Sequence, residues 1–286
     1  MTHNPAVRVP VAKELPKVAQ HTQAFLDDLS AAGYIGDIDV SYGGRLVAAT
    51  DNSIYQQLPQ AVLYPKSQND LACLLRVASQ PSHQQVRFSP RGGGTGTNGQ
   101  SLTPGVVIDL SRYLTRILEL NLKEGWVRVE AGVVKDALNE YLAPHGFFFA
   151  PDTSTSNRAT IGGMIGTDAS GQGSLVYGKT SNHVVSLRSY LVTGELLESQ
   201  PIPRQQAESK AQQQSTEGRL YQQALASCVE KRAEIEAKFP PLNRFLTGYD
   251  LQHCWNAEAD TIDLSRLLTG AEGTLAVVAE AKLKIT

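Results

Sequence analysis

Apolar positions in the first part of the chain alternate between helical and strand-like spacing. Residues 14–32 carry apolar side chains three to four positions apart, which predicts an amphipathic helix that ends at Gly33. Residues 61–64 form a short apolar run that predicts a buried strand. A second helix is expected after Ser67, a good N-cap residue, because Asp70 occupies the capping-box position three residues later.

A glycine-rich run separates the next two predicted strands. Residues 86–88 and 106–110 are strand-like, and with the strand and helix before them they predict a small parallel unit. The glycine-rich run lies at the end of a strand in this unit. Open α/β layers bind ligands at that edge of the sheet.

Later segments favour antiparallel pairing. Residues 116–120 and 126–131, with a turn between them, predict a hairpin. Residues 184–192 and 195–197 predict two more strands, and residues 276–285 a final one. The larger sheet is therefore expected to be mainly antiparallel.

The remaining segments predict two helices and one exposed excursion. A short helix is expected over residues 134–142. Residues 200–214 are rich in Pro, Gln, Ser and Lys, which predicts a mobile surface segment. Residues 220–235 predict a helix with a charged, solvated face, closed by Pro240-Pro241.

Composition and charge narrow the class of protein. The 286 residues are 41% hydrophobic, enough for a large core in one or two domains. The net charge of -2 gives no basic excess for nucleic acid or an anionic membrane. No segment approaches the roughly 20 apolar residues of a membrane span, so the expected location is the cytoplasm. The three cysteines are far apart, and no histidine lies at metal-ligand spacing, so we expect neither disulfides nor a metal site.

Residues 90–99, Pro-Arg-Gly-Gly-Gly-Thr-Gly-Thr-Asn-Gly, are the first candidate site. Half of them are glycine, which allows backbone amides to turn inward and form a nest of N–H donors suited to a phosphate. A plain glycine-rich surface loop is the alternative interpretation.

Two familiar phosphate motifs nearly match this run. Residues 94–99 fit G-x-G-x-x-G, but a turn and a strand follow them instead of the helix that a Rossmann site needs. A Walker A loop would need lysine where Gln100 stands, so nucleoside triphosphate hydrolysis is not supported.

Residues 151–178 are the second candidate site. The stretch is nearly free of charge and dense in hydroxyls and glycine, which lets a backbone approach a flat ligand closely. A flexible linker is the alternative. Apolar residues such as Ile161 and Ile165 punctuate the stretch and favour an ordered, partly buried segment.

Taken together, the motifs resemble those of the FAD-linked oxidases with the vanillyl-alcohol-oxidase or PCMH fold. The motifs, which occur in the order and spacing of that family, are Pro90-Arg91-Gly92-Gly93-Gly94-Thr95-Gly96, Ala159-Thr160-Ile161-Gly162-Gly163, Tyr177-Gly178 and Gly270-Ala271-Glu272-Gly273-Thr274-Leu275. The resemblance covers roughly residues 38–286. It looks closest to the bacterial D-2-hydroxyglutarate and D-lactate dehydrogenases that carry a fused iron-sulfur region.

The resemblance implies an α+β fold of the PCMH type with FAD between two α+β subdomains. One would contain the small parallel βαβ unit, and the other the larger, mainly antiparallel sheet with helices. The expected divisions are an N-terminal helical extension over residues 1–37, subdomain 1 over residues 38–113 and subdomain 2 over residues 114–286. A helical insertion is expected at about residues 200–262.

The resemblance also implies a set of cofactor-binding residues. Residues 91–97 would wrap the pyrophosphate, the stretch after Thr160 would line the ribityl chain and flavin ring, and Gly178 and Val185 would lie toward the adenosine. The full set is Arg91, Gly92, Gly93, Gly94, Thr95, Gly96, Thr97, Pro151, Ser154, Thr160, Gly162, Gly163, Thr167, Asp168, Ser170, Gly171, Gly178, Val185, Glu272 and Gly273.

Three positions depart from the family pattern. Relatives that bind flavin covalently through this loop have histidine where Thr95 stands, so noncovalent FAD is expected. The family's usual asparagine after the Gly-Gly motif is Asp168 here. In the last motif, Ala271 and Ala276 replace a serine and a glycine.

The resemblance implies oxidation of a D-2-hydroxy acid, but no catalytic residue is assigned. In the family a cap after the final strand supplies the base and the arginines that hold the carboxylate, so this chain alone is expected to be inactive. His145, His183 and His253 are possible bases, but each is isolated in the sequence, which favours a structural role. The expected partners are a small 2-hydroxy acid and an electron acceptor or iron-sulfur region outside the chain. The alternatives are an NADPH-fed flavin reductase of the same fold and a non-catalytic electron-transfer module.

Overall fold

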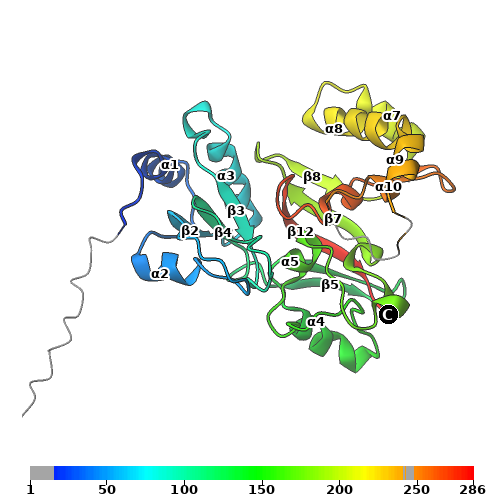
Figure 1. Ribbon diagram of the computed structural model, residues 1–286, viewed down its shortest axis with the longest axis horizontal. Coiled ribbons are helices and arrows are strands. Elements are labelled where there is room, and N and C mark those ends of the chain that lie inside the picture. The colour runs from blue at the N-terminus through cyan, green and yellow to red at the C-terminus, as the bar shows by residue number, and fades with distance from the viewer. Residues whose placement is uncertain (1–15, 241, 243–247) are drawn as a thin grey trace, which may run out of the picture.

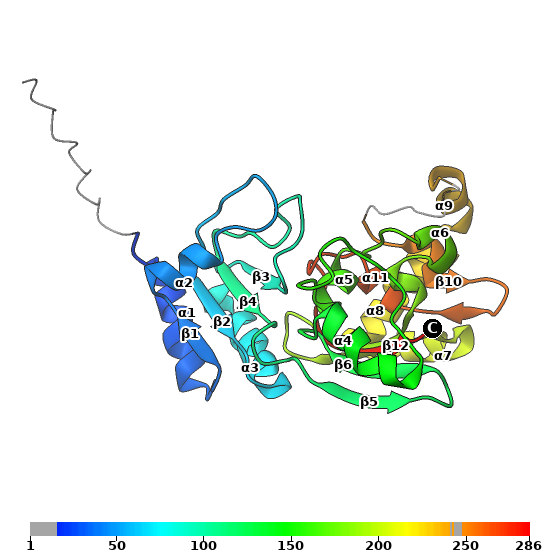
Figure 2. The ribbon, with the colours of Figure 1, turned by 90° about the horizontal axis from the view of Figure 1, so that it is seen from below.

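Two lobes, each built on its own sheet, make up the chain. The computed structural model describes residues 16–240, 242 and 248–286. Figure 2 shows the lobes side by side, with the N-terminal helices and strands on one side and the rest of the described chain on the other. Parallel and antiparallel sheets occur together with helices, which confirms the expected α+β class.

The first sheet has the strand order β1-β2-β4-β3. β2, β4 and β3 run parallel, and β1 joins the edge antiparallel to β2. The parallel unit predicted from the sequence is therefore confirmed. Its strands are β1 (Asp37–Asp39), β2 (Ala61–Tyr64), β3 (Phe88–Arg91) and β4 (Val106–Asp109).

Helices α1 and α3 pack together beside this sheet (Figure 1). The capping box predicted at Ser67 and Asp70 is present at the start of α3. The first helix was predicted to begin at residue 14, but α1 begins at Gln20, since the N–H of Ala19 binds the side chain of Gln60. Residues 14 and 15 lie outside the described residues. The helices of this lobe are α1 (Gln20–Ala31), α2 (Tyr42–Val47), α3 (Gln68–Ala78) and the short η1 (Pro81–His83).

The second sheet is antiparallel throughout, with the order β5-β6-β12-β7-β8. The predicted hairpin is β5 and β6, and the predicted final strand is β12 at the centre of the sheet. The strands are β5 (Ile117–Asn121), β6 (Trp126–Glu130), β7 (Val184–Tyr190), β8 (Leu196–Ser199) and β12 (Val277–Lys284).

The hydroxyl- and glycine-rich stretch is ordered, which decides against a flexible linker. It contains α5, whose Ile161 and Ile165 are fully buried in the core of the second lobe. The helices that lie between the strands of this lobe in the sequence are α4 (Lys135–Leu142), η2 (Ala143–His145), α5 (Ile161–Gly166), α6 (Ser174–Tyr177), η3 (Thr180–Asn182) and α11 (Ser265–Leu268).

The segment between β8 and α11 forms helices that extend from the second lobe (Figure 1), together with a small three-stranded sheet. The mobile excursion predicted over residues 200–214 is wrong, because this segment forms β9 and α7, with Ile202 and Ala207 buried. The elements are β9 (Ile202–Pro203), α7 (Arg204–Ala211), α8 (Thr216–Ala224), the π-helical η4 (Leu225–Val229), α9 (Arg232–Lys238), α10 (Leu251–Cys254), β10 (Trp255–Asn256) and β11 (Thr261–Ile262).

The single helix predicted over residues 220–235 is also corrected. The π-helical turn η4 interrupts it and separates α8 from α9. Helix α9 ends at Lys238, just before Pro240, while Pro241 lies outside the described residues.

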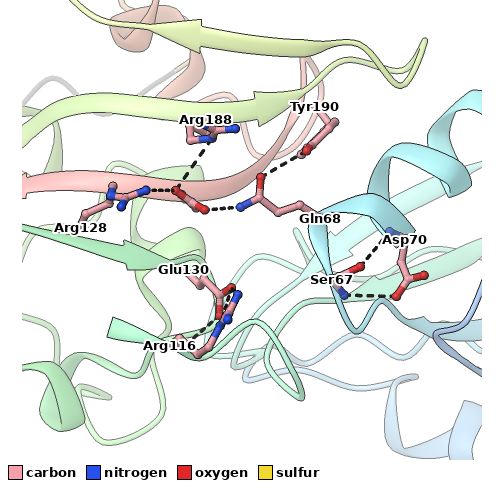
Figure 3. Close-up of polar contacts among 9 residues, drawn as sticks. Ser67, Gln68, Asp70, Arg116, Arg128, Glu130, Arg188 and Tyr190 are labelled. Atoms are coloured by element: carbon pink, nitrogen blue, oxygen red, sulfur yellow. Dashed lines mark hydrogen bonds and ion pairs between the residues drawn. The ribbon is translucent and has the colours of Figure 1, made fainter. Parts of the chain in front are cut away.

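A polar contact joins the lobes where α3 faces the second sheet (Figure 3). The amide of Gln68 donates to Glu280 in β12 and accepts from the hydroxyl of Tyr190 in β7 at 3.2 Å. Glu280 is also paired with Arg128 at 3.2 Å and lies 3.9 Å from Arg188. One buried carboxylate therefore connects both lobes.

Cys73, Cys228 and Cys254 are buried free thiols. Within the described part of the chain, no helix has the length and apolar character needed to cross a membrane.

Candidate functional site

A cleft of about 620 Å³ lies where the glycine-rich loop after β3 meets α5 and the loop before β12. The loop that follows β3 lies at the carboxyl end of a parallel strand, the edge predicted to bind a ligand. The cleft therefore brings together three motifs that are far apart in the sequence.

The glycine-rich loop lines the cleft with backbone donors. Among the described residues, the N–H groups of residues 93–97 have no hydrogen-bond partner within the protein. The side chain of Arg91 donates to the carbonyl of Thr50 at 2.7 Å and to Ser101 at 3.1 Å, and it packs against Gly94, where a Cβ would lie 2.4 Å from its guanidinium. Arg91 thus fixes the loop while the amides remain available to an anion.

Two glycines let this loop approach the α5 region closely. A Cβ on Gly92 would lie 2.0 Å from the hydroxyl oxygen of Thr160, and one on Gly93 would lie 2.0 Å from the carbonyl oxygen of Arg158. Both distances are far inside van der Waals contact, so glycine is required at these positions.

Thr160 and Gly162 set the position of α5 against the second sheet. Thr160 caps the helix by accepting from the N–H of Gly163 at 3.3 Å. The N–H of Gly162 donates to the carbonyl of Ala131 at 2.7 Å, and a Cβ on Gly162 would meet the Ala131 Cβ at 2.7 Å. The Gly-Gly motif therefore places α5 directly on the end of β6.

The last motif closes the cleft by touching the other two. A Cβ on Gly273 would lie 2.3 Å from the ring of Pro90, and the N–H of Glu272 donates to the carbonyl of Gly166 at 2.8 Å. Glu272 has φ of 50° and Asp168 has φ of 45°, a conformation uncommon for residues other than glycine. Strained backbone of this kind is concentrated at ligand sites.

The structure brings most of the predicted cofactor-binding residues into this one cleft. Those that line it are Arg91, Gly92, Gly93, Gly94, Thr95, Gly96, Thr97, Ser154, Thr160, Gly162, Gly163, Thr167, Asp168, Ser170, Gly171, Glu272 and Gly273. Pro151, Gly178 and Val185 do not line it. Pro151 is buried, Val185 is in β7, and Gly178 lines a second cleft.

Other lining residues were missed in the sequence. They are mostly apolar and include Leu110, Ala131, Leu268 and Val278. Strand and helix periodicity marks such residues as core, and nothing in their local sequence distinguishes the ones that border a cleft.

The second cleft, of about 650 Å³, lies beside the first and is lined by α6, α10 and the start of the loop after α11. Its His253 lies 2.8 Å from Asp250. Burial is the largest single influence on Asp250 and opposes its ionisation, but the hydrogen bonds to His253 together with the charges of His253 and Arg266 lower the pKa of the carboxyl.

The other two histidines considered as bases line neither cleft. The ring of His183 is buried and its Nε2 lies 2.7 Å from the carbonyl oxygen of Tyr177. His145 is exposed at the end of η2. Neither is placed to act in the first cleft.

Residues 59–200 match the family described as FAD binding domain. This segment belongs to that family, which confirms the resemblance to FAD-linked oxidases. The chain is 57% identical over 278 residues to D-2-hydroxyglutarate dehydrogenase of Pantoea ananatis and 54% identical over 278 residues to the protein of that name from Escherichia coli. Each match covers 97% of this chain but only 27% of the relative.

A solved structure shares the fold at low identity. Alkyldihydroxyacetonephosphate synthase aligns with a TM-score of 0.66 and 19% identity, over 95% of this chain and 45% of that one. The chain spans about a quarter of the length of the curated relatives it matches.

The described residues fit FAD. The free amides of residues 93–97 suit a pyrophosphate, and the apolar side chains of the cleft suit a flat ring. The hydroxyl of Thr153, which lines the cleft, is buried without a hydrogen-bond partner among the described residues. A buried polar atom of this kind is satisfied when a ligand donates to it or accepts from it.

Proposed function

We propose that this cleft holds FAD, and that the protein to which the chain belongs oxidises a D-2-hydroxy acid to the 2-oxo acid. The observation that carries the proposal is the row of unpaired amides at residues 93–97, opposite the N-terminus of α5. The pyrophosphate lies against these amides, while Thr160, Gly162, Gly163 and the stretch from Thr167 to Gly171 border the ribityl chain and ring. Gly178 and Val185 are proposed to lie toward the adenosine.

The residues of the chain act as a cradle in this proposal. The glycine-rich loop donates hydrogen bonds from its backbone, and the apolar lining, such as Leu110 and Val278, excludes water. When bound, FAD supplies the acceptor for the electron pair that leaves the hydroxy acid. A base for the hydroxyl proton and a cation for the carboxylate are also needed, and we place both outside this chain.

The substrate class is inferred from the relatives named D-2-hydroxyglutarate dehydrogenase. D-2-hydroxyglutarate is the first candidate, with D-lactate second. We further propose an electron acceptor or iron-sulfur region outside the chain, and a cytoplasmic location.

We also propose a division into subdomain 1 (residues 38–113) and subdomain 2 (residues 114–286), after an N-terminal extension. The end of β4 at Asp109 and the start of β5 at Ile117 support a boundary between them. Helix α1 of the extension packs on α3, so it contributes to the core of subdomain 1.

The substrate proposal is tested by anaerobic reduction. D-2-hydroxyglutarate added to the full-length protein that carries this chain is expected to bleach the flavin absorbance within the time of a single turnover, and L-2-hydroxyglutarate serves as the control. Bleaching by NADPH alone would favour a reductase instead. A flavin that neither compound reduces would favour a non-catalytic module.

FAD is expected to be released when the chain is precipitated with acid. Thr95 stands where covalent relatives have histidine, and a threonine hydroxyl cannot form the imidazole link. The absorption spectrum of the supernatant should therefore contain all of the flavin. Colour that stays in the pellet would contradict noncovalent binding.

A further inference from the structure

Of the described residues, Asp168 alone lines both clefts. It lies two residues beyond the end of α5, and its φ of 45° is in the left-handed region that Asn and Asp tolerate better than most residues. A Cβ on Gly270, in the loop that closes the first cleft, would lie 3.6 Å from the Cβ of Asp168. The wall between the clefts is therefore built around this residue.

The carboxylate of Asp168 is held by three donors. Lys179 Nζ lies 2.6 Å from one oxygen, the Ser181 hydroxyl donates to the same oxygen at 3.1 Å, and the Ser181 N–H donates to the other at 2.8 Å. Asp168 is 5% exposed and Lys179 is 9% exposed. The pair is a buried ion pair that joins the end of α5 to η3, next to the FAD cleft.

Opposite charges at this distance cancel each other in the wall of the cleft. If one partner becomes neutral, the other remains as a net charge in surroundings where water screens little. A positive charge near a flavin stabilises its more negative, reduced form, and a negative charge destabilises that form. The pair can therefore influence the flavin without touching it.

We propose that Asp168 and Lys179 are positioning residues of the FAD cleft, which fix the backbone after α5 and, by pairing, keep each other from placing a net charge beside the flavin. The inference rests on the proposed place of FAD. Failure of the unaltered chain to bind FAD would count against the proposed function itself, whereas the experiment below compares variants with a chain that binds it.

The test is a double-mutant cycle with two readouts, FAD affinity and the reduction potential of the bound flavin. Asp168→Asn keeps a residue type that tolerates positive φ, and the amide oxygen of its side chain can still accept from Ser181. It removes the carboxylate that is paired with the ammonium of Lys179. Lys179→Met leaves the carboxylate without its ammonium. Each single variant is expected to bind FAD about tenfold more weakly, and the double variant within about twofold of the unaltered chain.

The potential distinguishes an electrostatic role from a merely structural one. Asp168→Asn is expected to raise the potential and Lys179→Met to lower it, each by about a factor of ten in the reduction equilibrium, or about 30 mV for a two-electron couple. The double variant should return to the starting value. Lys210→Met is the control, because it breaks a 2.6 Å ion pair with Glu217 that lines neither cleft.

Opposite shifts that cancel in the double variant support the proposal. Shifts of the same sign, or shifts no larger than that of the control, overturn it. If the single variants fail to fold or to bind FAD, recovery in the double variant supports the pairing, and a double variant that also fails overturns it.

Discussion

Gly93→Ala is expected to weaken FAD binding about a hundredfold, a loss of roughly 2.7 kcal/mol. The added Cβ would lie 2.0 Å from the carbonyl oxygen of Arg158, which is a backbone atom and cannot rotate away. The glycine-rich loop must then move away from the α5 region, which separates the two sides of the cleft. Titration of the apo chain with FAD, followed by flavin fluorescence, measures the effect.

Gly43→Ala is the matched control. Gly43 is in α2, and a Cβ there meets no atom within 4 Å. Alanine is favoured over glycine inside a helix, so the variant should bind FAD normally and be slightly more stable. If Gly93→Ala binds FAD as tightly as Gly43→Ala does, the close approach of loop and helix is not needed for the cofactor.

Glu280→Ala is expected to reduce the free energy of unfolding by about 3 kcal/mol. The substitution leaves Gln68 without its acceptor and leaves Arg128 and Arg188 without the carboxylate between them. The hydrogen bond between α3 and β12 is lost at the same time, while the one from Tyr190 in β7 to Gln68 remains (Figure 3). Urea unfolding measures the loss, and FAD affinity should also fall because the two lobes carry opposite sides of the cleft.

Glu198→Ala is the control, because Glu198 is also paired with Arg188. Glu198 lies 2.7 Å from Arg188, but its side chain is 64% exposed. Exposed ion pairs contribute about 0.2 to 1 kcal/mol, so a small change is expected. Equal losses in the two variants would show that Glu280 does not link the lobes.

Local signals in the sequence predicted much of the fold. The capping box at Ser67 depends on residues three positions apart, and the hairpin of β5 and β6 on a short turn, so both could be recognised without the rest of the chain. The same holds for the glycine-rich loop. The absence of a predicted helix directly after this loop excluded a Rossmann site. The structure places the loop after the parallel strand β3, as expected.

Predictions failed where distant partners decide the structure. Residues 200–214 have a polar composition, but β9 pairs with β11 and buries Ile202, which orders the segment. The helix predicted over residues 220–235 contains a π-helical turn where η4 contacts α10. Composition and periodicity describe a segment by itself and contain no information on such contacts.

By itself, the sequence contained three recognisable motifs, the glycine-rich run, the Gly-Gly motif and the final Gly-Ala-Glu-Gly motif, because each consists of neighbouring residues. Only the tertiary structure decided that these three motifs meet. Gly273 packs on Pro90, Glu272 bonds to Gly166, and Gly93 approaches Arg158. The tertiary structure also decided the Asp168–Lys179 ion pair, because the segment between these residues, which contains α6, folds back and brings the two charges together. The motifs form one site because the two sheets pack into their own cores and bring the loops at their ends together. No property of the separate motifs requires the loops to meet.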